Sequence, residues 1–415
     1  MLEEIQNFNR NTWLFLLSTS IYYLGAGIFF LVFNIYIVEG LHYSKYFLGV
    51  LLSASSFSSA FFALPAGIVG DRIGRKNCLL IGMILIAFSM VLLTHVTARP
   101  VLILANGFLG CGNTIAYVSF APFMMENTTA KERVQVFSVN GALLTAGYTA
   151  GAYIGGTLPS LLSLPHPEQL RVPLLIAVGF CGCAVVPLWW VAEKKHSAHP
   201  FLSQPMLVNS ALMKKFLFNQ IVIGSGAGLI VPFFNIFFVD RLNISVNLVG
   251  TIFALGNITT GIATFLAASV AARWGKVRSI VITQLLSLPF LLMIAYSYQV
   301  SLVTIGFIAR GALMNMGGPI ASAFMMEHIQ ERERATINGI VSAGWHGSWA
   351  VSNILAGALM DRALYHIPFL ITCSLYALSS GVYYFFFASL EKSPPHEDIR
   401  SAPVKKWWER FLIKR

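Results

Sequence analysis

The sequence predicts an all-α integral membrane protein with twelve transmembrane helices in two similar six-helix bundles. Three observations lead to this fold class. Of the 415 residues, 56% are hydrophobic and only 11% are charged, and the mean hydropathy is +0.70. The apolar residues gather in twelve long runs, and the second half of the chain repeats the first. Soluble domains carry about 25% charged residues, so this composition excludes an ordinary soluble fold.

The apolar runs are the basis for the predicted membrane spans. Each run is long enough for a tilted helix that crosses the hydrocarbon core of a bilayer. Helices are expected because backbone polar groups cannot remain unpaired in lipid. The expected spans are residues 13–38, 46–70, 77–96, 100–125, 134–158, 171–192, 215–239, 246–271, 279–298, 301–326, 337–360 and 366–389.

The spans also give an expected domain order. A polar segment that contains proline separates the sixth span from the seventh, and we expect it to be a cytoplasmic linker. The final segment, KKWWERFLIKR, suits either a short helix on an anionic leaflet or a solvated basic tail. The expected domains are a six-helix bundle at 1–192, the linker at 193–214, a second six-helix bundle at 215–390 and the basic tail at 391–415.

The basic residues predict the orientation in the membrane. With the N-terminus placed inside, 22 of the 28 Lys and Arg residues fall on the inner side. This excess predicts a multi-pass protein of the plasma (cell inner) membrane with both termini in the cytoplasm. It also accounts for the net charge of +11 without a nucleic-acid partner. The polar, acidic start of the chain argues against a cleaved signal peptide.

Several function classes find no support in the sequence. All five cysteines lie in or at the ends of apolar runs, so we expect neither disulfides nor a metal site. A phosphate loop of the G-x-x-x-x-G-K type is missing, which argues against an ATP-driven pump and against an enzyme. We therefore expect no cofactor, and we expect a monomer in the lipid bilayer.

A shift of 201 positions aligns the two halves without gaps. The shift places the FNI motif of the first span on that of the seventh, and FMME of the fourth span on that of the tenth. Six spans per half is an even number, so the halves are parallel repeats. Transporters built this way bind substrate near the bilayer midplane, between the halves. The aligned positions include Gly25 and Gly226, Asn34 and Asn235, Glu39 and Asp240, Gly49 and Gly250, Gly74 and Gly275, Glu126 and Glu327, Arg133 and Arg334, and Gly156 and Gly357.

The loop after the second span resembles the signature of the major facilitator superfamily. That family carries G-x-x-x-D-R-x-G-R-K there, and this chain matches every fixed position with Gly67, Asp71, Arg72, Gly74, Arg75 and Lys76. The resemblance covers the whole chain and implies the family's twelve-helix transporter fold. The second half carries a partial copy, in which Ala272 replaces the acid.

The charges of this loop predict a gate. Asp71 at a helix end can accept hydrogen bonds from a neighbouring helix N-terminus, and Gly74 permits a tight turn. Glu126 is the expected partner of Arg75, and Arg133 follows Glu126 by seven residues. The resemblance implies that Asp71, Arg75, Glu126 and Arg133 form a network that holds the outward-facing state. The alternative is ordinary interfacial charge that anchors the spans.

The fifth span favours the exporters of the family. Residues 147–156 resemble the G-x-x-x-G-P-x-x-G-G pattern of drug and solute antiporters, except that Ala152 replaces Pro. Close helix packing explains such glycines equally well. In the fourth span, Asn106 stands where exporters carry Arg, which weakens the prediction of drug–proton antiport.

Arg310 is the one charge deep in a predicted span. A cation at this depth is costly and needs a partner. It can bind an anionic group of the substrate, or be satisfied by groups such as Asn315, or lie shallower and snorkel outward. His346, beside Trp345, is either a neutral packed histidine or a group that responds to protons.

The remaining candidates are amides, phenols and two acids. None of the seventeen acids lies deep in a span, so the repeat mates Glu39 and Asp240 are the best acidic coupling candidates, with solvated helix-end charge as their alternative role. A bare metal ion would require more carboxylates. The cavity therefore suits an amphipathic or anionic organic solute. Its further candidate residues are Tyr22, Tyr23, Asn34, Asn106, Asn113, Tyr148 and Asn235.

These features predict a secondary transporter that moves a small organic solute by alternating access. Proton-coupled efflux is the leading prediction. Uptake of an organic anion bound by Arg310 is the alternative. A transporter-like sensor or lipid-moving protein is a further alternative, and a lipid role predicts a lateral opening toward the bilayer.

Overall fold

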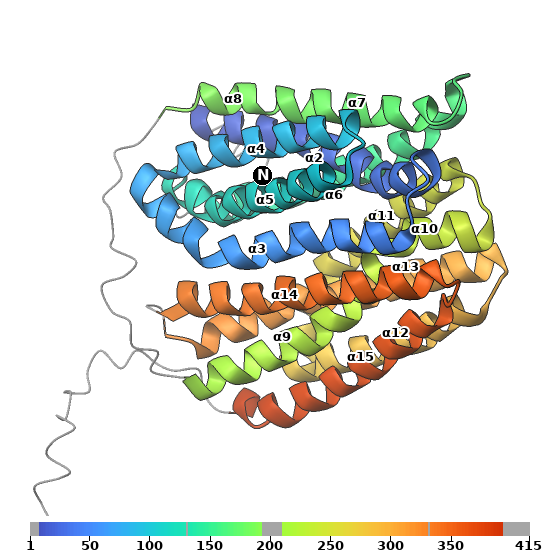
Figure 1. Ribbon diagram of the computed structural model, residues 1–415. Helices are drawn as coiled ribbons and strands as arrows, with labels where there is room; N and C mark the ends of the chain where they lie inside the picture. The colour runs from blue at the N-terminus through green and yellow to red at the C-terminus, as the bar shows by residue number, and fades with distance from the viewer. Residues whose placement is uncertain (1–7, 130–131, 193–209, 331–332, 393–415) are drawn as a thin grey trace, which may run out of the picture.

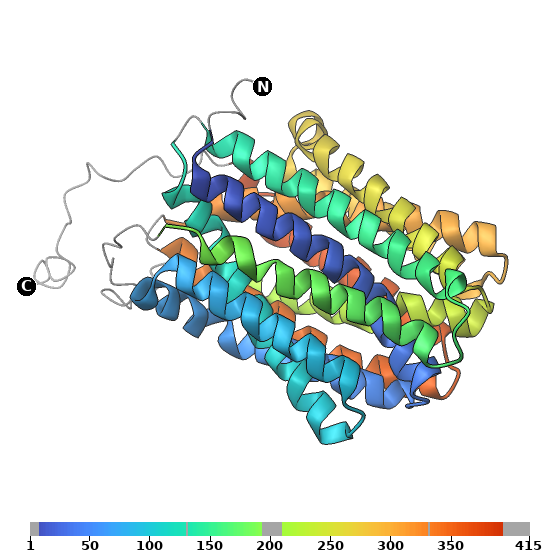
Figure 2. The same ribbon diagram turned by 90° about the horizontal axis from the view of Figure 1, so that it is seen from above.

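The computed structural model describes residues 8–129, 132–192, 210–330 and 333–392. Within these ranges the chain has no strand, and twelve membrane-length helical segments pack in two groups (Figure 1). Figure 2 shows the segments of both groups running along one common direction over the length of the molecule. The predicted all-α, twelve-helix membrane fold is confirmed.

The order of elements follows the predicted spans in each half. The N-terminal half contains α2 (Arg10–Ile35) with η1 (Tyr36–Gly40), α3 (Lys45–Ile73), α4 (Arg75–His95), α5 (Arg99–Glu126), α6 (Arg133–Leu161), and α7 (Glu168–Cys183) with α8 (Val185–Trp189). The C-terminal half contains α9 (Ser210–Ile230), η2 (Val231–Phe233), α10 (Phe234–Ile236), η3 (Phe237–Arg241), α11 (Val246–Trp274), α12 (Lys276–Tyr296), α13 (Val300–His328), α14 (Arg334–Asp361), α15 (His366–Phe387) and η5 (Leu390–Lys392). The predicted leaflet helix in the tail lies outside the described residues.

Two long helices are too polar to qualify as membrane spans by composition alone. In the described chain, ten segments are long and apolar enough to span a membrane by composition alone. The other two, α6 and α14, are 29 and 28 residues long and contain more Gly, Ser, Thr and Asn. Each packs against a helix of the opposite half, α6 on α11 and α14 on α3. The α3–α14 pair lies side by side in the middle of Figure 1.

The seventh span is broken, which the sequence analysis did not predict. Helix α9 ends at Ile230, and Pro232 lies in the short 3₁₀ turn that follows. The Ile236 N–H donates to the Asn235 side chain at 3.0 Å, directly after the break. The Pro232 carbonyl accepts a hydrogen bond from the Asn34 amide of the other half. The first and seventh spans both end in a π-helical turn, η1 and η3, at repeat-equivalent positions.

The helix starts repeat as well. Ser44 caps α3 by accepting from the Phe47 N–H at 3.1 Å, and Ser245 caps α11 by accepting from the Leu248 N–H at 3.4 Å. Because Ser44 and Ser245 are 201 positions apart, the repeat extends to the hydrogen bonds that begin the helices.

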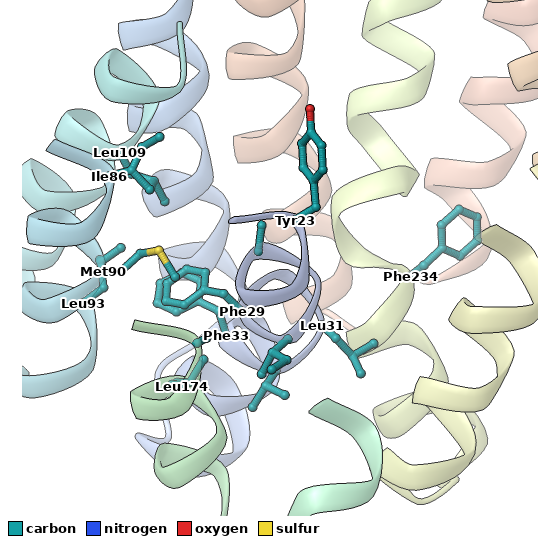
Figure 3. Close-up of a cluster of buried hydrophobic side chains, with 14 of the residues drawn as sticks. Tyr23, Phe29, Leu31, Phe33, Ile86, Met90, Leu93, Leu109, Leu174 and Phe234 are labelled. Atoms are coloured by element: carbon teal, nitrogen blue, oxygen red, sulfur yellow. The ribbon is translucent and has the colours of Figure 1, made fainter. Parts of the chain in front are cut away.

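The buried core joins the two halves unevenly. One apolar cluster fills the N-terminal half and continues into the C-terminal half, where it reaches Phe234 (Figure 3). In this cluster Phe29 and Phe33 of α2 stack with ring centroids 4.8 Å apart, near Leu174. A second buried cluster, which includes Phe216 and Phe324, belongs to the C-terminal half alone. The halves therefore share a core over only part of their length.

Candidate substrate site

The molecule has two ends that differ in their contacts. We call the end where α3 turns into α4 and α11 turns into α12 the basic end. The opposite end, where η1 leads into α3 and η3 leads into α11, is the far end.

Two glycine pairs bring the halves into backbone contact at the far end. Gly49 of α3 meets Gly357 of α14, and Gly250 of α11 meets Gly156 of α6. A Cβ on Gly49 would lie 2.4 Å from the Asn353 carbonyl oxygen, and one on Gly250 would lie 2.7 Å from the Gly156 Cα. The two pairs occupy repeat-equivalent positions. The same close approach therefore seals both seams between the halves.

A polar cluster reinforces one of these seams. The Lys45 Nζ of the N-terminal half lies 2.5 Å from the Asp240 Oδ2 and donates to the Tyr365 hydroxyl at 3.0 Å. The Tyr365 hydroxyl also bonds to Asp240, and the Lys45 N–H donates to the Asp361 Oδ1 at 2.9 Å. We call these four residues the far-end lock. Asp240, a predicted coupling candidate, is thus an ion-pair partner across the halves, whereas its repeat mate Glu39 has no ion pair in the described chain.

A buried amide pair also joins the halves. The Asn34 Nδ2 donates to the Pro232 carbonyl at 2.6 Å and to the Asn235 Oδ1 at 3.3 Å. The Asn235 Nδ2 donates to the Leu31 carbonyl at 2.8 Å. The broken seventh span supplies the first acceptor. These repeat mates form a bond across the halves and do not line the cavity described below.

At the basic end, the described residues of each half include an ion pair at repeat-equivalent positions. The Arg75 Nε lies 3.7 Å from the Glu126 Oε1, the partner that the sequence predicts. At the repeat-equivalent positions, Lys276 pairs with Glu327. Each pair joins two helices of the same half, α4 with α5 and α12 with α13. The predicted role of Glu126 and Arg75 in holding one transport state stays a prediction.

The loops beside these pairs are also symmetric. The Arg133 Nη2 donates to the Met125 carbonyl at 3.5 Å, and the Arg334 Nε donates to the Met326 carbonyl at 3.0 Å. In the first of these loops the Thr129 N–H and hydroxyl both donate to the Glu132 carboxylate. These bonds hold the pKa of that carboxyl below its ordinary value.

The signature loop is built around a left-handed glycine. Gly74 has φ 88° and ψ 152°, and its repeat mate Gly275 has φ 85°, a region that favours glycine. The predicted tight turn at Gly74 is therefore present. Arg72 is exposed, Lys76 is half-buried, and a Cβ on Gly67 would meet nothing within 4 Å. The side chain of Asp71 lies outside the described residues, so its predicted contact is untested.

A cavity of about 560 Å³ lies in the C-terminal half. This volume is within the range of sites that hold drug-sized ligands. Of its 21 described lining residues, Arg310 is the one charged side chain, and none is Asp or Glu. The lining comes from α9, η2, α12, α13, α14 and α15. It comprises Phe216, Asn219, Gln220, Ile223, Ala227, Val231, Ile280, Thr283, Gln284, Arg310, Met314, Asn315, Gly317, Gly318, Ala321, Ser322, Met325, Trp345, Trp349, Tyr376 and Tyr383.

Arg310 is held by aromatic groups. Its Nη2 donates to the Tyr376 hydroxyl at 2.9 Å. Its guanidinium carbon lies 5.6 Å from the Phe234 ring centroid and 5.9 Å from that of Tyr376, which gives cation–π attraction. Arg310 and Tyr376 each lie ten residues after the start of their helix, about 15 Å along it, so the bond forms at matching depth.

The structure bears on each of the three roles predicted for Arg310. Arg310 is 6% exposed, so the predicted outward snorkelling is wrong. In the described protein its guanidinium donates to the Tyr376 hydroxyl and not to Asn315, whose Nδ2 donates to the Gly311 carbonyl of its own helix. The Arg310 Nε has no hydrogen-bond partner in the described protein. Binding of an anionic group of the substrate by Arg310 stays a prediction.

Helix α14 presents two different faces. Trp345 and Trp349 line the cavity, with ring centroids 5.5 Å apart. His346 is half-buried and is not among the lining residues. It lies two turns from Gly339, which packs on Leu64, and two turns from Asn353, which packs on α3. Since residues seven apart share a helix face, His346 belongs to the seam between the halves.

The N-terminal candidates are bonded to one another. The Tyr22 hydroxyl donates to the Asn113 Oδ1 at 2.8 Å, and the Tyr23 and Tyr148 rings lie 5.8 Å apart. The Asn106 Nδ2 donates to the Leu51 carbonyl at 2.7 Å, which ties α5 to α3 and accounts for Asn106 by helix packing. None of these five residues lines the C-terminal cavity.

The sequence analysis missed several cavity residues. Tyr376 is the main one, and the available signal was a phenol at the depth of Arg310 in the last span. Another is Gln284, whose Oε1 accepts from Ser380 at 2.8 Å and whose Nε2 donates to Ser379 at 3.3 Å. The Ser379 hydroxyl donates in turn to the Asn219 Oδ1 at 2.9 Å. A single sequence does not show which neutral polar groups converge in this way.

The glycine pattern of the fifth span has a packing role. A Cβ on Gly147 would lie 2.6 Å from the Tyr23 Cβ, and one on Gly151 would lie 2.4 Å from the Leu24 carbonyl oxygen. These residues let α6 press against α2, whereas Gly156 on another face meets α11. Close helix packing therefore accounts for the pattern without the family's proline.

The chain was compared with known proteins on this structural background. The sequence pattern of the Major Facilitator Superfamily matches residues 15–222 and again residues 216–414. The chain belongs to this superfamily. It is therefore a multi-pass membrane transporter rather than an enzyme, and the family that the signature loop predicts is confirmed.

Known relatives differ in what their names describe. The chain is 24% identical over 332 residues to the tetracycline resistance protein, class B, of Escherichia coli. The aligned region covers 76% of this chain and 79% of that protein. A variant of the nucleoside transporter NupG has a TM-score of 0.76 at 15% identity, covering 91% of this chain and 100% of that one. The human organic anion transporter MFSD10 has a TM-score of 0.67 at 15% identity, covering 90% and 99%. These structural likenesses concern the fold alone.

Proposed function

We propose that this chain exports a small organic solute by alternating access, in exchange for protons. The observation that carries the proposal is the C-terminal cavity, whose one charged lining group is Arg310. Transporters with parallel repeats hold substrate near mid-depth, where Arg310 and Tyr376 meet. Residues 1–192 and 215–390 are then the two bodies that move, and 193–214 links them.

The far-end contacts support a specific resting state. Gly–Gly contacts on both seams, the amide pair and the far-end lock all join the halves at one end. Under the proposed orientation, with both termini in the cytoplasm of the cell's inner membrane, the far end is the outer side. The state with these contacts is then closed to the outside, and the cavity receives solute from the cytoplasm.

The direction of transport is supported by a relative and a motif. One relative is named for resistance to tetracycline, a compound that acts on cells, and removing such a compound from the cell gives resistance. The fifth-span glycine pattern also resembles that of exporters. Close packing explains these glycines too, so the relative carries more of this part of the proposal.

Proton coupling is assigned to two groups at the seams. His346 lies on the α14 face that packs on α3, where its charge would act on the contact between the halves. Asp240 pairs with Lys45 across the far end, so its protonation would remove that attraction. Both groups lie where a proton would change the balance between transport states, and neither belongs to the cavity lining.

Uptake of an organic anion is a second candidate function, because Arg310 would attract an anionic solute whether the protein imports or exports it. The two candidates differ in the sign of the proton exchange. Everted vesicles with an acidic lumen and a pH-sensitive dye distinguish them, with tetracycline and 2-naphthoate as solutes. Export by antiport predicts that adding solute releases protons from the lumen, which becomes less acidic. Coupled uptake predicts no proton release from the lumen. Vesicles without the protein are the control, and no solute-dependent change would count against the proposal.

A further inference from the structure

We propose that the cavity binds a planar aromatic anion and that the C-terminal half alone supplies the groups that recognise it. This inference rests on the proposed function in one respect, because it takes the cavity as the substrate site. It adds the chemical class of the ligand, and it assigns ligand recognition to the C-terminal half and opening of the path to the N-terminal half.

The charge of the ligand follows from Arg310. In the described chain no carboxylate lies within ion-pair distance of its guanidinium, and no lining residue is acidic. The Tyr376 hydroxyl and the rings of Phe234 and Tyr376 hold the guanidinium in place, but a buried cation without an anion remains costly. A carboxylate on the ligand supplies the missing charge and accepts two parallel hydrogen bonds from the guanidinium edge.

The hydrogen-bonding groups of the cavity also favour an anionic ligand. Three lining residues have a buried polar atom with no partner in the described protein: the Nε of Arg310, the Nε1 of Trp349 and the hydroxyl of Tyr383. The first two can only donate. Gln284 has both of its amide atoms committed to Ser379 and Ser380. A ligand rich in acceptors therefore fits this site better than one rich in donors.

The body of the ligand follows from the remaining lining. Phe216, Trp345, Trp349, Tyr376 and Tyr383 contribute five aromatic side chains, and Met314 and Met325 contribute flexible apolar ones. Aromatic rings attract a flat apolar body by stacking or edge contacts. Met side chains adapt to its outline. The combination with one cation describes an aromatic carboxylate.

The origin of these contacts gives the two halves different tasks. All of the described lining residues lie between Phe216 and Tyr383, in α9, η2 and α12 to α15. The N-terminal phenols Tyr22, Tyr23 and Tyr148 instead contact one another and Asn113. The ligand then stays with the C-terminal bundle during the transport cycle, while the N-terminal bundle opens and closes the path to it.

Binding of two isosteric probes tests the charge. Calorimetric titration of the detergent-purified protein would compare 2-naphthoate with the uncharged 2-naphthamide. Hydrogen bonds to charged groups predict about 10- to 100-fold tighter binding of the carboxylate. In Arg310→Gln this preference should fall to about twofold or less, and Arg310→Lys should keep part of it. Equal affinity of the two probes for the wild type, or no binding of 2-naphthoate, overturns the proposal.

A matched variant controls for general damage. Arg241 is an arginine of the same half, stacked on Phe237 and Tyr298 and absent from the cavity lining. Arg241→Gln should leave the preference for 2-naphthoate unchanged. If Arg241→Gln and Arg310→Gln lose the preference equally, Arg310 has a structural role only and the proposal is wrong.

The division between the halves has its own test. Trp345→Leu should weaken both probes by a similar factor, about 5- to 10-fold, because it removes apolar contact and no charge. Tyr148→Phe should leave both dissociation constants within about twofold. A larger loss in Tyr148→Phe than in Trp345→Leu overturns recognition by the C-terminal half. Charge-selective binding without transport contradicts the proposed function instead and leaves this inference standing.

Discussion

Replacing Gly250 by Ala should open the far end of the transporter. A Cβ at this position would lie 2.7 Å from the Gly156 Cα and 2.7 Å from the Ala152 carbonyl oxygen. Carbon atoms in contact prefer separations of about 3.5–4.0 Å, so α11 and α6 must part by about 1 Å. Overpacking of this kind costs about 1–3 kcal/mol. That cost falls on the far-end-closed state alone and shifts the equilibrium between transport states by about 5- to 150-fold.

Spin-label distances would report the shift. Labels on Leu161→Cys and Leu248→Cys, two exposed positions on opposite sides of this seam, suit pulsed electron resonance in proteoliposomes. The background should carry Cys183→Ser and Cys373→Ser, because Cys78, Cys111 and Cys181 are buried. Gly250→Ala should increase the population with a long distance. Gly141→Ala, in α6 with nothing within 4 Å of its Cβ, should not. An unchanged distance distribution in Gly250→Ala would refute the view that glycine contact closes this seam.

Three further changes test other parts of the structure. Gly74→Ala forces an L-residue to φ 88° and ψ 152°, a region essentially restricted to glycine, and should lower the free energy of unfolding by about 1–3 kcal/mol. The Tm should therefore fall in Gly74→Ala but not in Gly67→Ala. Equal Tm values would contradict the turn. Tyr376→Phe leaves the Arg310 Nη2 without its acceptor and should lower the free energy of unfolding by about 1–3 kcal/mol. Thermal melting would compare it with Tyr384→Phe, a change at an exposed position. Equal Tm values in the two variants would show that the bond does not stabilise the protein. The folded pKa of Glu132 is lowered, so its contribution to the free energy of unfolding is present above the unfolded pKa and is lost as the pH falls through the folded pKa. Glu132→Gln should flatten this part of the pH–stability profile. An unaltered profile would show that the bonds from Thr129 to Glu132 do not stabilise the fold.

The repeat made much of the fold predictable. Positions 201 apart share the π-helical ends of the first and seventh spans, the serine caps Ser44 and Ser245, and the left-handed glycines Gly74 and Gly275. The ion pair between Arg75 and Glu126 was predictable from charge and spacing. The turns and caps depend on local sequence, whereas the ion pair joins α4 to α5 and was predicted from the charges at the ends of those helices.

The features that were not predictable depend on which helices meet. Tyr376 is separated from Arg310 by 66 positions, and nothing local marks it as the partner. Asp240 suggested proton coupling, but its contact with Lys45 arises only when the two halves close. The sequence contains Pro232, but it does not show that the Pro232 carbonyl accepts a hydrogen bond from Asn34 of the other half. Tertiary contact decided each of these roles.

Proton-coupled export can be tested by the initial rate at which solute enters everted vesicles with an imposed acidic lumen. With 2-naphthoate as solute, we expect concentrative entry that stops when an uncoupler collapses the proton gradient. The rate should fall at least about tenfold in Arg310→Gln, a loss of at least about 1.4 kcal/mol, and stay near wild type in Arg241→Gln. Entry that does not depend on the proton gradient, or equal rates in the two variants, would contradict proton-coupled export through the cavity at Arg310.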